Sequence, residues 1–241
     1  MKIISFGGGV QSTAMAILAA QGKIEVDAFV FVDTGFEQSI VFDFLHTHTQ
    51  PMLDKAGIPF YIAKTKDYAA SFGDVKMPPF FANNKGTEGR TPAFCSHKWK
   101  REVFNRFCNK KFGAKSYDVL FGFSTDEIHR AARMKVSKKW NPVFPLLDLQ
   151  MRRGDCIALV QREFNVEPPR SSCWMCPNHR QDEWAKVMQS DDREKVIEYD
   201  EQILKPLGFF LTSEFKRITD CTFSDENEVM FSRLCSGGCF I

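Results

Sequence analysis

The chain has 241 residues, 44% of them hydrophobic, so it has ample material for the core of one large domain or of a domain with a small appendage. Its 32 basic and 30 acidic residues nearly balance, which excludes a dominant positive field of the kind that binds nucleic acid nonspecifically. The sequence shows no leader pattern and no apolar run of membrane-spanning length, so we expect a cytoplasmic protein with no membrane partner.

The opening stretch predicts a phosphate site. An apolar run around Ile3 and Ile4 predicts a buried strand, three glycines follow it, and an Ala/Met/Ile/Leu series over 13–20 predicts a helix. Glycines let the backbone approach an anion, and the unpaired amides of a helix N-terminus point toward it. A glycine-rich turn without a ligand is the alternative. The residues predicted to contact a nucleotide here are Ser5, Phe6, Gly7, Gly8, Gly9, Gln11, Ser12 and Thr13.

Three further apolar runs, at 26–32, 58–63 and 117–124, predict strands of a parallel sheet. The carboxyl ends of such strands meet at one edge, where open α/β sheets bind ligands. The polar residues that follow two of these runs are therefore predicted to lie beside the glycine turn. The residues predicted to lie at this edge include Asp33, Thr34, Gly35, Gly122, Asp126 and Arg130. For Glu127 and His129 a solvent-facing helix start is an equal alternative.

The middle of the chain predicts a long loop and a basic segment. Residues 71–92 have the Gly, Pro and Asn content of a loop, and Phe80, Phe81 and Arg90 would suit a lid over a nucleotide, with disorder as the alternative. The stretch that begins at Cys95 supplies candidate phosphate or sulfate contacts, unless it is only a solvated basic helix start. These contacts are Lys98, Lys100 and Arg101.

Cysteine spacing predicts a metal or redox site. The pair Cys173 and Cys176 places two thiols on one tight turn, and Cys235 and Cys239 form a second close pair near the end of the sequence. Eight cysteines in a cytoplasmic chain favour such chemistry over structural disulfides. Cys95 is a further candidate ligand, and the other three cysteines are predicted to be small buried hydrophobic residues: Cys108, Cys156 and Cys221. The tract 181–204 predicts a charged amphipathic helix.

The glycine stretch from Gly7 to Thr13 resembles the pyrophosphate loop (PP-loop) of ATP pyrophosphatases, Ser-Gly-Gly-x-Asp-Ser. Gly8, Gly9 and Ser12 match that pattern, whereas Gly7 replaces its first serine and Gln11 its aspartate. Further stretches resemble, in the same order, segments of the phosphoadenosine phosphosulfate (PAPS) reductase-like group of the adenine nucleotide alpha-hydrolase superfamily. They are Asp33–Gly35, Cys95–Arg101, Gly122–Arg130 and Cys173–Trp184. The resemblance implies nucleotide contacts at Asp33, Thr34, Gly35 and Gly122. The catalytic residues that it implies are Asp33, Lys98, Arg101, Asp126 and Arg130.

The resemblance implies an α/β fold with a parallel sheet of about five strands flanked by helices. It implies a nucleotide-binding domain over residues 1–150 and a small Cys-rich helical region over 151–241. The thiols would hold a 4Fe-4S cluster through Cys95, Cys173 and Cys176, completed by Cys235 or Cys239. The alternative is Zn²⁺ held by the four cysteines of the two close pairs.

The activity that the resemblance implies is the Mg²⁺-assisted adenylylation of an acceptor by ATP with release of pyrophosphate, in sulfur transfer or a related nucleotide or nucleic-acid modification. The alternatives are thiol-dependent reduction of a sulfonucleotide (PAPS or adenylyl sulfate) and a nucleotide-binding module without turnover. Expected partners are an adenine nucleotide and a nucleic acid or a sulfur-donor protein. The oligomeric state is left open between a monomer and a homodimer.

Overall fold

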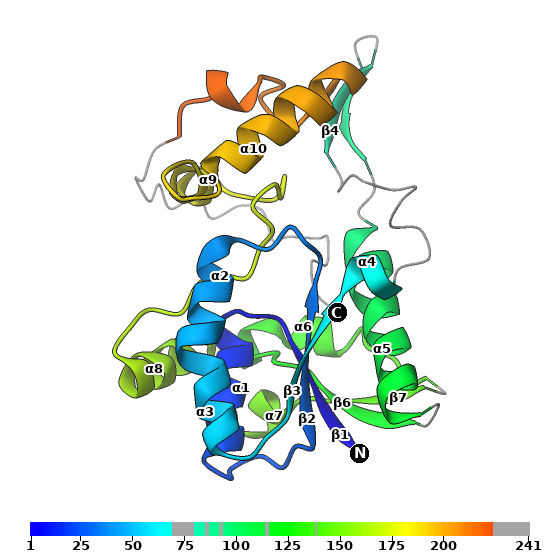
Figure 1. Ribbon diagram of the computed structural model, residues 1–241, viewed down its shortest axis with the longest axis vertical. Helices are drawn as coiled ribbons and strands as arrows, with labels where there is room; N and C mark the ends of the chain where they lie inside the picture. Colours follow the sequence, from blue (N-terminus) through cyan, green and yellow to red (C-terminus); the bar gives the residue numbers. More distant parts are fainter. Residues whose placement is uncertain (69–79, 85–86, 92–93, 114–115, 138, 224–241) are drawn as a thin grey trace.

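The computed structural model describes residues 1–68, 80–84, 87–91, 94–113, 116–137 and 139–223 (Figure 1). Within them, a five-stranded sheet has the strand order β3-β2-β1-β6-β7, and every neighbouring pair is parallel. β1 is the central strand: β2 and β3 lie on one side of it, and β6 and β7, which come later in the sequence, lie on the other. The strands are β1 (Lys2–Phe6), β2 (Ala28–Asp33), β3 (Phe60–Lys64), β6 (Tyr117–Leu120) and β7 (Trp140–Val143).

Helices cover both faces of this sheet (Figure 1). Successive strand residues point to opposite faces, so Ile4 packs into one core and Ile3 into the other. One core lies under α1 (Val10–Ala20), α2 (Ser39–Phe44), α3 (Gln50–Lys55) and α8 (Arg153–Phe164). The other lies under α5 (Glu102–Phe112), which follows α4 (Thr65–Tyr68) and a π-helical turn over Ser96–Arg101. The prediction of an α/β parallel sheet flanked by helices is confirmed.

Within the described ranges, no helix has both the length and the hydrophobicity needed to cross a membrane.

A second, smaller layer lies beyond the carboxyl-terminal edge of the sheet, and we call it the C-terminal module (residues 171–223 with the hairpin 81–90; Figure 1). Its elements are α9 (Gln181–Met188), α10 (Arg193–Tyr199) and a three-stranded sheet of β4 (Phe81–Asn84), β5 (Thr87–Arg90) and β8 (Phe209–Phe210). The prediction of a loop over 71–92 is therefore wrong for 81–84 and 87–90, and residues 71–79, 85, 86 and 92 lie outside the described part.

Aromatic packing explains this hairpin. The ring of Phe80 lies 3.8 Å, centroid to centroid, from that of Phe209, and Phe81 pairs in the ladder with Phe210. β-propensity and burial of these rings outweigh the loop-like composition of their neighbours. The rings thus build the module, and a lid over a nucleotide stays a prediction.

The charged tract over 181–204 forms two helices instead of the single predicted one. The hydroxyl of Ser190 donates to the carbonyl of Val187 at 2.8 Å and accepts the amide of Asp192 at 3.2 Å. Such local hydrogen bonds compete with the helical ladder, so α9 ends and α10 begins there.

The α8 helix packs on α1 through Cys156, Leu159 and Val160, so the hydrophobic unit built around the sheet continues to residue 164, past the predicted boundary at 150. From the sheet edge, Phe36 inserts into the module. Its ring stacks on Trp99 at 5.4 Å and contacts Trp174 at 5.7 Å, both between centroids. The two layers therefore share side chains.

Asp192 of the module ties it to the N-terminus of α2. The side chain is 1% exposed and accepts the backbone amide of Ser39 at 2.8 Å, its hydroxyl at 2.7 Å and the ammonium of Lys195 at 2.7 Å. Burial alone would raise the pKa of Asp192, but the hydrogen bonds from Lys195 and Ser39 outweigh it and hold the pKa below its usual range.

We expect Asp192→Ala to lower the free energy of unfolding by about 2 kcal/mol, because it removes a helix cap and leaves the partly buried donors of Ser39 without their acceptor. A depressed folded pKa means that the contribution is present above the unfolded value of ~4 and is lost as the pH falls through the folded value. Urea titrations of the wild type and of Asp192→Ala, at pH 7 and in acid, measure the free energy of unfolding. The exposed Glu198→Ala is the control, and an equal loss in both variants at pH 7 would contradict the role.

Candidate nucleotide site

The turn between β1 and α1, which we call the glycine corner (Gly7–Gly9 with the first turn of α1), accepts only glycine at its centre. Gly8 has φ +76°, and a Cβ there would lie 2.7 Å from Cγ1 of Val41. The hydroxyl of Ser12 accepts the amide of Gly9 at 3.0 Å and donates to its carbonyl at 2.9 Å. The remaining first-turn amides of α1 have no partner within the helix and suit an anion.

The glycine corner lies where the strand order reverses, between β1 and β6, which is the place where open α/β sheets bind ligands. Gly122, just after β6, lets the end of that strand lie close to the start of α1. A Cβ on it would lie 3.1 Å from Sδ of Met15 and 3.2 Å from the carbonyl carbon of Gln11. The end of β6 thus packs directly on the start of α1, and contact between Gly122 and a nucleotide stays a prediction.

A segment of the C-terminal module crosses the corner. The Ser171 hydroxyl donates to the carbonyl of Gly7, and a Cβ on Gly9 would lie 3.1 Å from Cβ of Ser171. Beyond it, the amide of Trp174 donates to the carbonyl of Phe36 at 2.9 Å. Residues 171–174 therefore lie between the glycines and the turn that follows β2.

That turn holds a buried glutamate in a series of hydrogen-bonded and ion-paired side chains. Glu37 is 4% exposed, and its Oε1 accepts the hydroxyl of Thr34 at 3.0 Å and pairs with Nζ of Lys100 at 3.1 Å. The Thr34 hydroxyl also lies 3.8 Å from Sγ of Cys173. The structure thus brings Thr34, Lys100 and Cys173 together at the corner. Sequence reasoning did not assign Glu37, although its place four residues past the strand was a usable signal.

Asp33 ends β2 and is partly exposed beside the corner. Its Oδ1 accepts the amide of Gly35 at 2.7 Å, and Gly35 has φ +80°. This local bond turns the chain at the strand end and fixes the carboxylate there, because Asx turns of this kind use a side chain in place of a backbone acceptor. Asp33 and Gly35 therefore stay candidates for nucleotide contact.

A second polar cluster flanks the corner on the β6 side. The Gln11 amide nitrogen donates to Oε2 of Glu127 at 3.0 Å, and its oxygen accepts Nη1 of Arg153 at 3.0 Å. Arg130 pairs with Glu127, and its guanidinium carbon lies 4.3 Å from the ring centroid of Phe123. The predicted Arg130 is thus close to the corner, and Arg153 joins it there.

Asp126 has a local structural contact. Its Oδ2 accepts the backbone amide of Arg153 at 2.6 Å and lies 3.4 Å from the hydroxyl of Ser124. The carboxylate therefore seats the start of α8, and its predicted part in catalysis stays a prediction.

Five other predicted residues have less direct positions relative to the corner. Lys98 and Arg101 are exposed, and no interaction in the described ranges ties either to the corner. The ring of Phe6 packs edge-on against Phe29, Phe31 and Phe60 in the core, so only its backbone faces the turn. Thr13 is fully buried, and Ser5 lies within β1.

The predicted thiol set is only partly described. Cys95 and Cys173 both pack against the aromatic core of the module. Among the described residues, no three His, Cys, Asp or Glu side chains gather as ligands for a metal ion, and Cys235 and Cys239 lie outside this part of the chain. Burial raises the pKa of Cys108 and of Cys156 to about 12, which fits the prediction that they are inert core residues.

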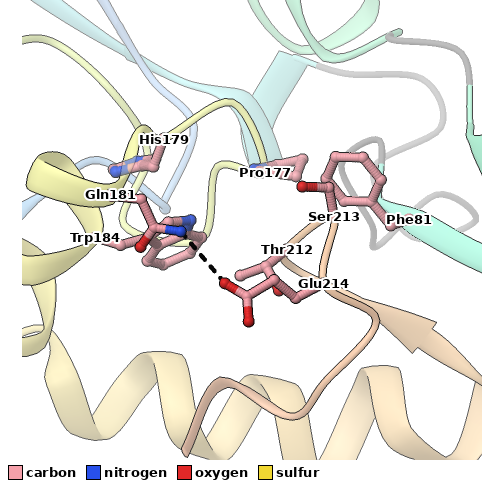
Figure 2. Close-up of a pocket in the computed structure, with 8 residues that line it drawn as sticks. All are labelled: Phe81, Pro177, His179, Gln181, Trp184, Thr212, Ser213 and Glu214. Carbon is pink, nitrogen blue, oxygen red and sulfur yellow. Dashed lines mark hydrogen bonds between the residues drawn. The ribbon is translucent and has the colours of Figure 1, made fainter. Parts of the chain in front are cut away.

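Two hollows of the described surface lie away from the corner. One encloses about 60 Å³ and is seen in Figure 2, where Gln181 donates to Glu214 at 3.3 Å across it. With ~30 Å³ for each water molecule, it is too small for a nucleotide. A more open hollow of about 420 Å³ lies at the far end of α1 and includes Leu18 and Lys23. Neither includes the phosphate-suited amides, so we place the candidate site at the corner.

No model of a known protein family matches this chain, and no curated protein matches its sequence. Among solved structures, the chain is similar to the U34-tRNA thiolase NcsA from Methanococcus maripaludis, solved with its 4Fe-4S cluster. The two are 14% identical over 97% of this chain and 78% of that one, with a TM-score of 0.48. A likeness at this level does not carry a functional assignment.

The glycine corner yields a paired stability prediction. We expect Gly57→Ala, at φ +71° with nothing within 4 Å, to show only the strain of a left-handed residue, about 1–2 kcal/mol. Gly8→Ala has the same strain and also meets Val41, so we expect a further ~1–3 kcal/mol. Chemical denaturation of both variants measures the difference. Equal losses would show that the corner has room for a side chain.

Proposed function

We propose that this chain binds an adenine nucleotide by its phosphates at the glycine corner and uses ATP to adenylylate an acceptor, releasing pyrophosphate. One observation carries the proposal: a glycine-only turn, at the switch point of a parallel sheet, leads into the N-terminus of an eleven-residue helix. Exposed amides at such a helix start favour a polyanion, and the resemblance of the turn to a PP-loop supports a nucleotide.

The proposed chemistry follows from that placement. An acceptor oxygen attacks the α-phosphorus of ATP, a new P–O bond forms, and the bond to the β-phosphate oxygen breaks so that pyrophosphate leaves. A sulfur or nitrogen nucleophile then displaces AMP from the activated acceptor. The cations beside the corner, Lys100, Arg130 and Arg153, are placed to offset charge on the phosphates, with Lys98 and Arg101 as further candidates.

Mg²⁺ fits this site although no group of three ligands is present in the described residues. The ion commonly takes one or two carboxylates together with phosphate oxygens and water, and Asp33 stands at the required strand end. When bound, it would neutralise charge on the phosphate tail.

A thiol at the corner supports sulfur chemistry. Cys173 lies 3.8 Å from the Thr34 hydroxyl, on the segment that also contacts Gly7. The same observation favours a second candidate function, thiol-dependent reduction of a sulfonucleotide, which would release sulfite and no pyrophosphate. For the first function we propose that the acceptor is a nucleic acid, or a small molecule that receives sulfur from a sulfur-donor protein.

Substitution at Gly7 tests nucleotide binding. A Cβ there meets only hydroxyl oxygens, of Ser12 at 3.9 Å and Ser171 at 4.0 Å, so we expect Gly7→Ala to fold normally. Gly7→Leu extends into the corner, and we expect ATP affinity to fall about tenfold or more at a nearly unchanged melting temperature.

Equilibrium dialysis with ATP and Mg²⁺, followed by assays of AMP and pyrophosphate with candidate acceptors, makes the measurement. Wild-type protein that binds no ATP overturns the proposal. ATP binding without pyrophosphate release under any acceptor indicates a non-catalytic module, and sulfite release from a sulfonucleotide indicates the reductase.

The metal prediction needs a separate test, because the described thiols alone do not form a ligand set. We propose a 4Fe-4S cluster on Cys95, Cys173 and Cys176 with Cys235 or Cys239, and no step above passes through it. Anaerobically purified protein should then hold about four iron atoms per chain and absorb in the visible range. Cys173→Ser should lose the iron, whereas Cys108→Ser should keep it. About one zinc and no iron would favour the zinc alternative.

A further inference from the structure

Position 11 departs from the loop that it resembles, because it carries an amide in place of a carboxylate. Gln11 is the second residue of α1, and hydrogen bonds fix its side chain at both ends. The amide nitrogen donates to Glu127 and the amide oxygen accepts from Arg153, each at 3.0 Å. Both partners follow other strands of the sheet, so three chain segments meet at this side chain.

Glu127 is the carboxylate that this arrangement directs toward the corner. Its other oxygen, Oε1, pairs with Arg130, and the side chain is 25% exposed, so it is held in place but reachable from solvent. Its neighbour Asp126 is instead engaged by the backbone amide of Arg153 at 2.6 Å. Of the two acids after β6, Glu127 is thus the one joined to the glycine corner through Gln11.

The side chains at positions 11 and 127 are complementary, because one is a neutral hydrogen-bond donor and the other a negatively charged acceptor. An aspartate at position 11 would place a second negative charge close to Glu127, and two carboxylates in one small site repel each other. A neutral amide at position 11 removes that repulsion and donates a hydrogen bond that holds Glu127. In this chain the carboxylate that meets position 11 therefore comes from the segment after β6.

We propose that Glu127 supplies the carboxylate that the loop lacks at position 11, and that it serves the Mg²⁺ ion of a nucleoside triphosphate bound at the corner. This inference rests on the proposed function and adds a residue to it. Gln11 acts as a positioning residue, since it holds Glu127 without carrying charge. The donor chemistry fits, because Mg²⁺ is bound through one or two carboxylates together with phosphate oxygens.

ATP affinity with and without Mg²⁺ tests the proposal. We expect Glu127→Gln to weaken ATP binding in Mg²⁺ by about tenfold or more and to leave Mg²⁺-free binding unchanged. Moving the charge back, in the double variant Gln11→Asp with Glu127→Gln, should restore much of the loss. Asp148→Asn, in α7 (Pro145–Asp148), is the matched control and should bind as wild type.

Mn²⁺ substituted for Mg²⁺ provides a readout independent of activity, because its electron paramagnetic resonance signal reports the bound ion directly. Thermal melting checks that each variant folds, and Glu127→Asp, which keeps the charge, should retain more affinity than Glu127→Gln.

The outcomes separate the two ideas. If the wild-type chain binds no ATP, the proposed function fails and this inference fails with it. If it binds ATP with Mg²⁺ and Glu127→Gln does the same, only the inference is overturned. Equal weakening with and without Mg²⁺, or no recovery in the double variant, also overturns it, since Glu127 would then only orient Gln11.

Discussion

The close approach of three backbone segments at the glycine corner is the constraint on which the rest of the site depends. Val41 closes one side of the turn and Ser171 the other, leaving room for no side chain at Gly8 and little at Gly9. These neighbours lie about 30 and 160 residues along the chain, so the corner takes its shape only when the sheet, α2 and the module have assembled. Once assembled, its amides are held in place before any ligand arrives, which lowers the ordering cost of binding.

The two flanks of the corner differ in their electrostatic setting. On the β2 side, Glu37 and Lys100 pair in the interior, where screening by salt is weak and each charge depends on its partner. On the β6 side, Glu127 and Arg130 are partly exposed, so ions and water reach them and their geometry can adjust. The buried flank therefore suits a fixed framework that presents Cys173, and the open flank suits an exchangeable ligand.

The parallel sheet, its helical cover and the glycine turn were predictable because each has a local pattern: apolar runs of strand length, Gly7–Gly9, and polar residues at strand ends. The hairpin at 81–90 was not, since its strands are stabilised by Phe209 and Phe210, far away in the sequence. The roles of Ser171 and Arg153 at the corner could not be predicted for the same reason. Nothing in a serine or a single arginine indicates that it will meet Gly7 or Gln11, because that information lies in tertiary packing.

The insertion of Phe36 into the aromatic core has a consequence for how the chain can be truncated into fragments. The same turn holds Asp33 at the strand end and packs Phe36 against Trp99 and Trp174, so side-chain packing joins the two layers at this turn. If a ligand binds this turn more tightly when the module is folded, thermodynamic reciprocity requires that the ligand stabilise the module by the same factor. Dissection of the chain near residue 150 would therefore separate Gly7 from Ser171 and Phe36 from Trp174.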